Sequence, residues 1–148
     1  MTKRELGEKY FVEGYNCAQS VALAFSSEVG LDNDTLLKVI SGFGGGFGRM
    51  REVCGAVSGM VFVISSVCGY VSPTDNDNKM ALYKKVQDLM NKFKEQNGTY
   101  ICRELLSLPD GPSTPTPEKR TETYYKKRPC KDLVGDACEI LDNYLKTL

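Results

Sequence analysis

The 148-residue sequence contains no histidine. A protein without histidine has no Ser-His or Cys-His catalytic pair, no imidazole ligand for a metal ion and no side chain that ordinarily titrates near pH 7. Hydrolases and metalloproteins that depend on imidazole are therefore excluded. Any metal or redox chemistry in this chain has to come from other side chains.

The sequence also lacks a net charge, because 19 basic and 19 acidic residues cancel. No overall electrostatic field then attracts nucleic acid or an anionic membrane surface. The basic segment 119–131 is the one local exception. Such a patch is more often a solvated surface than a docking site, although it could dock an acidic redox partner or nucleic acid. We expect no nucleic-acid partner, and the sequence does not identify a redox partner protein.

No apolar run is long enough to cross a bilayer. The most apolar segment, residues 56–71, is interrupted by serines and glycines and is shorter than the roughly 20 apolar residues that a spanning helix needs. The N-terminal residues MTKRELGEKYF alternate charged and apolar side chains and lack the apolar stretch of a secretory signal. We therefore expect a cytoplasmic protein without membrane insertion, in which segment 56–71 is buried.

The six cysteines include no C-x-x-C pair. Thioredoxin-like exchange motifs and most zinc ribbons and knuckles use such closely spaced cysteines. In a reducing compartment, several cysteines indicate metal, cluster or redox chemistry more often than structural disulfides. A site with four thiolates would therefore have to be assembled from distant segments of the chain.

Helical periodicity and capping residues predict an all-α fold with a single domain over residues 1–148. Asn16 followed by Gln19 forms a capping-box pattern, and Asp32 begins a second cap cluster. The expected bundle has about six to seven helices around the apolar helix 54–71, with helices at 3–13, from 17, from 33 to about 42, and at 77–97, 100–108 and 130–147.

Two further features of the expected bundle follow from the same patterns. The apolar face of helix 77–97 includes Met80 and Tyr83, which we expect to point inward. The proline-rich segment 109–117 predicts an extended surface loop. The small residues at the start of helix 54–71 could also pack against a second subunit, so a homodimer remains open.

Glycines are concentrated in residues 42–59, GFGGGFGRMREVCGAVSG. A P-loop requires Lys followed by Ser or Thr after its last glycine, and Gly48 is followed by Arg49 instead. Arg49 also occupies the place of the third glycine in a dinucleotide-binding fingerprint. The pattern therefore disfavours a nucleotide site. It indicates close backbone packing with positive φ, or a loop that wraps around a cluster; the candidate cofactor-binding residues are Gly44, Gly45, Gly46, Gly55 and Gly59.

Four cysteines follow predicted helix starts, namely Cys17, Cys54, Cys102 and Cys130. Free N–H groups and the positive end of the helix dipole favour an anion at a helix N-terminus, so we expect these thiols to ionise more readily than ordinary cysteines. Cys68 lies about 21 Å beyond Cys54 along one helix, and Cys138 lies about 12 Å beyond Cys130 along another. Cys68 and Cys138 are therefore interpreted as small buried apolar residues.

The motifs GYNCAQSV, CGAVSG and CREL, together with Cys130, resemble the C_GCAxxG_C_C family over nearly the whole chain. The family pattern of four cysteines with a CGAxxG motif falls on the same four cysteines that follow the helix starts. The resemblance implies a redox-active protein, and related domains occur fused to multihaem or iron–sulfur electron carriers. It names no substrate.

Three functions are compatible with four converging thiols. The first is electron transfer or redox sensing through an iron–sulfur cluster held by Cys17, Cys54, Cys102 and Cys130. The second is metal-free thiol–disulfide chemistry, in which Cys54 cycles against one of the other three. The third is a structural Cys₄ zinc site. If the site is thiol-based, the cations best placed in sequence to lower thiol pKa values are Arg49, Arg51 and Arg103, although such residues are more often solvated surface charges. We expect the four cysteines to converge in one site that the proline-rich loop roofs.

Overall fold

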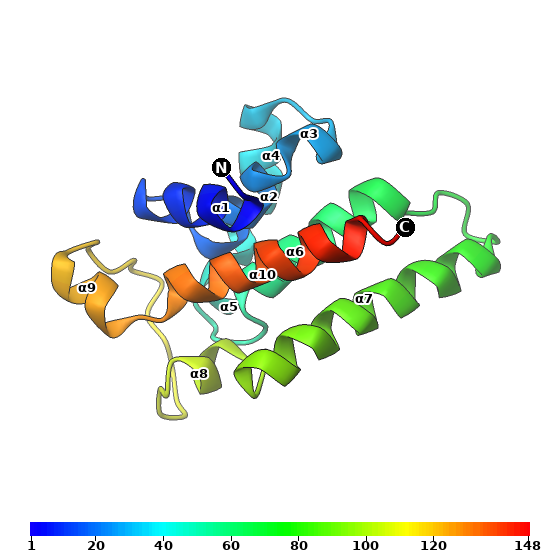
Figure 1. The fold of residues 1–148 in the computed structure, drawn as a ribbon. Helices are drawn as coiled ribbons and strands as arrows, with labels where there is room; N and C mark the ends of the chain where they lie inside the picture. Colours follow the sequence, from blue (N-terminus) through cyan, green and yellow to red (C-terminus); the bar gives the residue numbers. More distant parts are fainter.

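The structure, a computed structural model, describes residues 1–148 and contains helices but no strand. This confirms the all-α fold (Figure 1). The elements are α1 (Lys3–Val12), α2 (Cys17–Ala24), α3 (Ser26–Val29), α4 (Asn33–Ile40), the 3₁₀ turn η1 (Ser41–Phe43), α5 (Gly44–Phe47), α6 (Gly55–Cys68), α7 (Asn76–Asn97), α8 (Cys102–Leu105), α9 (Glu122–Lys127) and α10 (Cys130–Leu145). The helices of at least eight residues are α1, α2, α4, α6, α7 and α10.

Local capping fixes the starts of the first helices. The Asn16 side chain accepts a hydrogen bond from the Gln19 N–H, and the Gln19 side chain accepts one from the Asn16 N–H, which is the predicted capping box. Asp32 caps α4 through the Thr35 N–H. The sequence did not predict the short helices α3 and α9, because each is at most six residues long and shows little periodicity.

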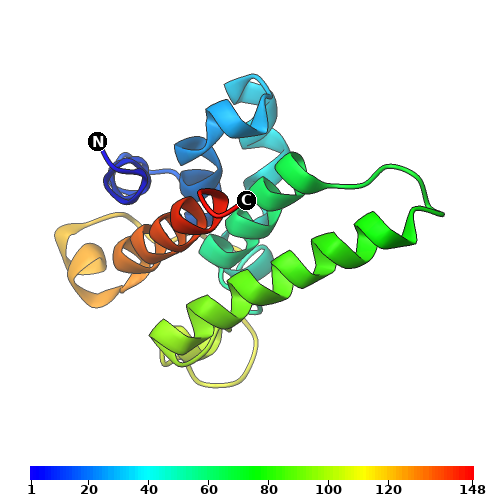
Figure 2. The ribbon, with the colours of Figure 1, turned by 45° about the vertical axis from the view of Figure 1, so that its right-hand side comes forward.

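Helix α6 lies at the centre of the bundle, as predicted. It packs against α2, α7 and α10, and Figures 1 and 2 show it enclosed by these neighbours. Its side chains Val57, Met60, Val63 and Ile64 are fully buried. Burying such apolar side chains supplies the main driving force for folding. The helix ends at Cys68, three residues before the predicted end.

The prediction for the start of α7 was wrong. Met80 and Tyr83 are 69% and 53% exposed, whereas Leu82, Leu89 and Phe93 form the buried face. The N-terminal part of α7 extends past the neighbouring helices (Figure 2), so nothing covers this part of its apolar face. The ring of Tyr83 instead contacts Tyr70 edge to face, at 6.4 Å between centroids.

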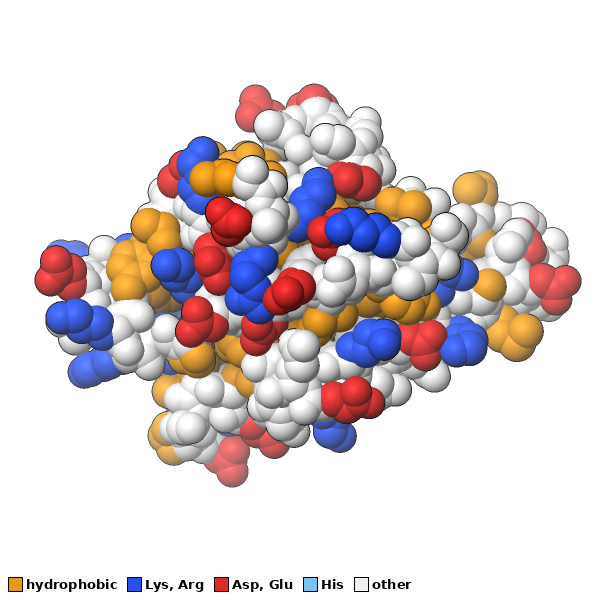
Figure 3. All heavy atoms as spheres, viewed as in Figure 1, with side chains coloured by type: hydrophobic (Ala, Val, Ile, Leu, Met, Phe, Trp, Pro, Cys, Tyr) orange, Lys and Arg blue, Asp and Glu red, His pale blue; other side chains and the backbone are white.

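No helix of the structure has both the length and the apolar composition required to span a membrane. On the face shown in Figure 3, basic and acidic side chains are interspersed. One such group joins α1 to α10, where Arg4 pairs with Glu8, Asp136 and Glu139. The surface on this side therefore carries no continuous patch of one sign.

The contact between α2 and α6 depends on Gly59, so we expect Gly59→Ala to destabilise the protein. Alanine normally favours a helix interior over glycine by about 1 kcal/mol. A Cβ at this position, however, would lie 2.7 Å from the Val21 Cβ and 3.1 Å from the Ala18 carbonyl oxygen. Overpacking costs roughly 1–3 kcal/mol, so the net effect on the free energy of unfolding should be a loss, measurable by urea denaturation. Gly42→Ala is the control, because a Cβ there meets no atom within 4 Å; equal stability of the two variants would contradict the prediction.

Candidate functional site

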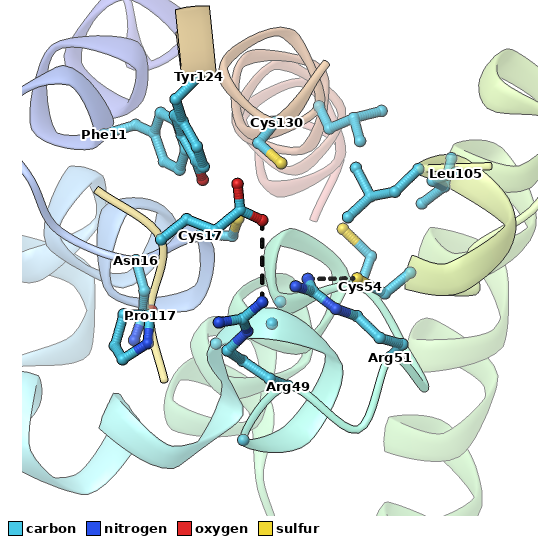
Figure 4. Close-up of a pocket in the computed structure, with 18 of the residues that line it drawn as sticks. Phe11, Asn16, Cys17, Arg49, Arg51, Cys54, Leu105, Pro117, Tyr124 and Cys130 are labelled. Atoms are coloured by element: carbon cyan, nitrogen blue, oxygen red, sulfur yellow. Dashed lines mark hydrogen bonds and ion pairs between the residues drawn. The ribbon is translucent and has the colours of Figure 1, made fainter. Parts of the chain in front are cut away.

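Four cysteines line one pocket. Its volume is about 290 Å³, and its wall includes Cys17, Cys54, Cys102 and Cys130. Figure 4 shows the labelled side chains converging from different elements of the fold. Cys68 and Cys138 do not line the pocket. The structure therefore brings together the four cysteines that the sequence singled out and leaves the other two outside.

Each of these four cysteines lies at a helix start. Cys17, Cys102 and Cys130 are the first residues of α2, α8 and α10, and Cys54 is the N-cap of α6. The Cys54 side chain makes no capping hydrogen bond, but the backbone N–H groups of Ala56 and Val57 act to lower the pKa of its thiol. Helix N-termini from four separate segments therefore present thiols to one cavity.

We expected all four thiols to ionise readily at their helix N-termini, but only Cys130 has a lowered pKa. A hydrogen bond from the Cys17 thiol lowers the pKa of Cys130 and raises the pKa of Cys17 well above its ordinary value. Burial raises the pKa of Cys54 to about 12, and burial also raises the pKa of Cys102 despite the nearby Arg51 guanidinium. Removal from water disfavours the charged form, and for Cys54 and Cys102 it is the largest effect on the pKa and outweighs the favourable helix N-terminus.

The pKa directions predict an order of alkylation among the pocket cysteines in the reduced, metal-free protein. The thiolate is the nucleophile, so Cys130 should react with iodoacetamide at pH 7 before Cys17, Cys54 and Cys102. Peptide mapping by mass spectrometry after short exposures measures the order. Cys68, outside the pocket, serves as an internal reference for reagent activity. Faster labelling of Cys54 or Cys17 than of Cys130 would show that the thiolate is located elsewhere.

The glycine-rich segment forms a left-handed turn. Five consecutive residues, 45–49, have φ between 58° and 71°. Three backbone hydrogen bonds close the turn at a spacing of six residues: Gly48 N–H to Gly42 O, Arg51 N–H to Gly45 O and Glu52 N–H to Gly46 O. Left-handed backbone costs an L-residue roughly 1–2 kcal/mol, whereas glycine adopts it freely. The glycines therefore let the chain coil with the opposite hand just before Cys54.

The candidate glycines occupy different places relative to the pocket. Gly44, Gly45 and Gly55 line it. Gly46 is buried behind the wall, where a Cβ would lie 2.8 Å from the Cys102 Cβ. Gly59 does not line the pocket and instead allows the close approach of α2.

Two of the three predicted cations line the pocket. Arg49 and Arg51 do so, and the Arg51 Nη1 donates a hydrogen bond to the Cys102 Sγ at 3.7 Å (Figure 4). Arg103 does not line it; this side chain donates instead to the carbonyl groups of Pro109 and Gly111 and so holds the proline-rich segment. Proximity in sequence to Cys102 was a poor guide for Arg103, because the side chain points away from the thiol.

Sequence reasoning missed the contribution of the segment after the prolines. Glu118 and Arg120 line the pocket together with Pro115 and Pro117, so the proline-rich segment covers the site as predicted and continues into it. Arg120 donates to the backbone carbonyls of Phe11 and Tyr15. The basic character of segment 119–131 was the available signal, but the pattern alone favoured a solvated patch.

Glu118 is the one acidic side chain of the pocket wall. It forms ion pairs with Arg128 and, at 3.8 Å, with Arg49. Two buried donor atoms nearby have no hydrogen-bond partner at all, Arg49 Nη1 and Arg51 Nε. The wall thus combines thiols, one carboxylate and incompletely paired guanidinium groups.

The side-chain donors of the pocket can be compared with those that a metal ion or an iron–sulfur cluster requires. No three Cys, Asp or Glu side chains lie close enough together to hold a single metal ion. The pocket nevertheless offers four sulfur donors around one cavity, and Gly44, Gly45, Gly48 and Gly55 leave its wall free of side chains at four positions. Its unpaired guanidinium donors are suited to a ligand that carries negative charge. These features fit a multinuclear sulfur-ligated group better than a single ion.

Comparison with known proteins gives one match. A family model described as "Putative redox-active protein (C_GCAxxG_C_C)" matches residues 15–144, a range that includes all four pocket cysteines. No curated protein and no solved structure matches the chain.

Proposed function

The chain belongs to the C_GCAxxG_C_C family of redox-active proteins, and from this premise we propose that its four-cysteine pocket holds an iron–sulfur cluster for electron transfer or redox sensing. The observation that carries the proposal is the meeting of Cys17, Cys54, Cys102 and Cys130 around one cavity of about 290 Å³. These thiols come from four segments spread over most of the chain.

The spacing of the thiols favours a cluster over a zinc ion. Zinc in a Cys₄ site binds each sulfur at about 2.3 Å, which draws the four sulfurs to within roughly 4 Å of one another. The cysteines of this pocket are not gathered to that degree. The thiolates of an iron–sulfur cluster bind different iron atoms and therefore stand further apart. A cavity lined by four sulfurs fits the second arrangement.

Residues around the thiols are suited to support such a cluster. Four Cys thiolates are the usual ligand set, and hydrogen bonds to the sulfurs and burial tune the reduction potential. Here Arg51 donates a hydrogen bond to the Cys102 sulfur, and the Ala56 and Val57 N–H groups at the start of α6 favour the thiolate form of Cys54. When bound, the cluster would supply one-electron redox chemistry. The buried Cys54 would hold it away from solvent.

The test is anaerobic purification followed by a visible spectrum and analysis of iron, acid-labile sulfide and zinc. The expected result is a coloured protein with iron and sulfide in matching amounts, which gives an electron paramagnetic resonance signal in one oxidation state. A protein that stays colourless and iron-free, even after anaerobic incubation with ferrous iron and sulfide, would overturn the proposal.

The contact between Cys17 and Cys130 supports a second candidate, metal-free thiol–disulfide exchange. Both thiols line the pocket, and their interaction lowers the pKa of Cys130 while it raises that of Cys17, which is the arrangement of an attacking thiolate near a second thiol. Forming the disulfide would release two electrons and two protons, which reduce a disulfide of a partner protein to two thiols. If the protein is iron-free, oxidation should yield a Cys17–Cys130 disulfide in peptide maps.

A further inference from the structure

We propose that the four-cysteine pocket also binds a small oxyanion, held by the guanidinium groups of Arg49 and Arg51 beside the thiols. The inference rests on the proposed function in that it takes this pocket as the reaction site and names a class of ligand for it. Binding of the anion itself does not require the cluster, so the two proposals can fail separately.

The first observation is a pair of buried donors without acceptors. Arg51 is 8% exposed, and its Nη1 reaches the Cys102 sulfur while its Nε has no partner. The Nη1 of Arg49 is likewise buried and unpaired. Nearly all buried polar groups in proteins are hydrogen-bonded, since leaving one unpaired is costly. Both arginines line the pocket, as Figure 4 shows, so a ligand there can supply the missing acceptors.

The second observation is the strained backbone that carries these two side chains. Arg49 and Arg51 have φ values of 69° and 63°, in the left-handed region that favours glycine. Three of the six left-handed residues of this segment are glycines; of the other three, Phe47 does not line the pocket, whereas Arg49 and Arg51 do. Strained non-glycine residues are concentrated at binding and active sites, where the surrounding structure fixes them for function. Here the strain turns two guanidinium groups toward the same cavity.

The third observation is the charge of the wall. Arg49, Arg51 and Arg120 line the pocket, whereas Glu118 is its one carboxylate. Arg120 is occupied by the carbonyl groups of Phe11 and Tyr15, which leaves Arg49 and Arg51 as the donors available to a ligand. Guanidinium groups bind planar or tetrahedral oxyanions with two parallel hydrogen bonds. A small oxyanion therefore matches both the sign and the donor geometry of the site.

Glu118 shows which kind of group the site accepts. Its carboxylate comes from the segment that covers the pocket and pairs with Arg49 and Arg128. It is an internal oxyanion next to the unpaired donors, and an incoming ligand would compete with it for Arg49. Removing the charge of Glu118 should consequently strengthen binding of an external anion, which a purely structural ion pair would not do.

The experiment is isothermal titration calorimetry of sodium sulfate and sodium formate into the reduced, metal-free full-length protein at constant ionic strength in chloride. Saturable binding is expected for at least one of the two. Arg51→Gln should weaken it at least about tenfold, the effect of losing one charge-assisted hydrogen bond, and Glu118→Gln should strengthen it. Lys126→Gln and Glu122→Gln are matched controls for charge, because both residues are exposed and outside the pocket. Preference for sulfate assigns a tetrahedral oxyanion, and preference for formate assigns a carboxylate.

The inference would be overturned if neither sulfate nor formate bound to the native protein or to Glu118→Gln. Undiminished binding to Arg51→Gln would overturn it as well, and Arg49→Gln replaces that variant if Arg51→Gln does not fold. Iron and sulfide are measured on the native protein in parallel. Iron without anion binding refutes only the oxyanion site, and anion binding without iron refutes only the cluster.

Discussion

Cys54→Ser is expected to abolish the iron content of the anaerobically purified protein while the chain stays folded. Cys54 is 4% exposed and caps α6, with its sulfur facing the cavity shared by the other three thiols. Serine has nearly the same shape as cysteine and is a favourable residue at a helix N-cap. Loss of iron would then report the loss of a ligand, since far-UV circular dichroism and the melting temperature should stay close to native values.

The matched control for this substitution is Cys68→Ser. Cys68 is half-buried near the end of α6 and lies outside the pocket, so its replacement should leave iron and sulfide unchanged. Native iron content in Cys54→Ser would exclude Cys54 as a ligand. Equal iron loss in both variants would show that the metal responds to a general disturbance of α6. If neither native nor variant protein binds iron, the thiol–disulfide candidate predicts that Cys54→Ser still forms the Cys17–Cys130 disulfide.

Features set by neighbouring residues were predictable from the sequence. The capping box of Asn16 and Gln19 and the Asp32 cap depend on residues three positions apart, so the pattern alone locates these helix starts. Because Cys17 directly follows the Asn16 cap and Cys130 directly follows Pro129, their positions at helix N-termini were also predictable. The pattern does not contain the distance between helix ends. We predicted that the four cysteines converge in one site, and the folded chain places all four in the wall of one pocket.

Features set by distant contacts were not predictable. Desolvation raises the pKa of Cys54. The size of this increase depends on how completely other segments of the chain enclose the thiol. Arg103 is adjacent to Cys102 in sequence but binds the proline-rich segment, whereas Arg51 reaches Cys102 from 51 positions away. Glu118 enters the pocket only because the segment after the prolines folds back over it. Side-chain direction at such positions is decided by packing, which the sequence pattern does not encode.

The substitution Gly46→Ala, in the left-handed turn, is expected to destabilise the protein strongly. Gly46 has a φ of 71°, which costs alanine roughly 1–2 kcal/mol. A Cβ there would also lie 2.6 Å from the Glu52 backbone nitrogen and 2.8 Å from the Cys102 Cβ, and overpacking of this kind costs roughly a further 1–3 kcal/mol. The free energy of unfolding should therefore fall by about 2–5 kcal/mol, as measured by urea denaturation.

Gly48→Ala separates the two causes of this loss. Gly48 has a φ of 58°, but a Cβ there meets no atom within 4 Å, so this variant should lose only the roughly 1–2 kcal/mol of left-handed strain. The excess loss in Gly46→Ala measures the close approach of the turn to Cys102. Because a Cβ at residue 46 would press on Cys102, which lines the pocket, Gly46→Ala should also displace the Cys102 thiol, whereas a Cβ at residue 48 meets no atom that it could displace. Equal stabilities of the two variants would show that the turn can move away from Cys102 at little cost, and that the glycines serve backbone conformation alone.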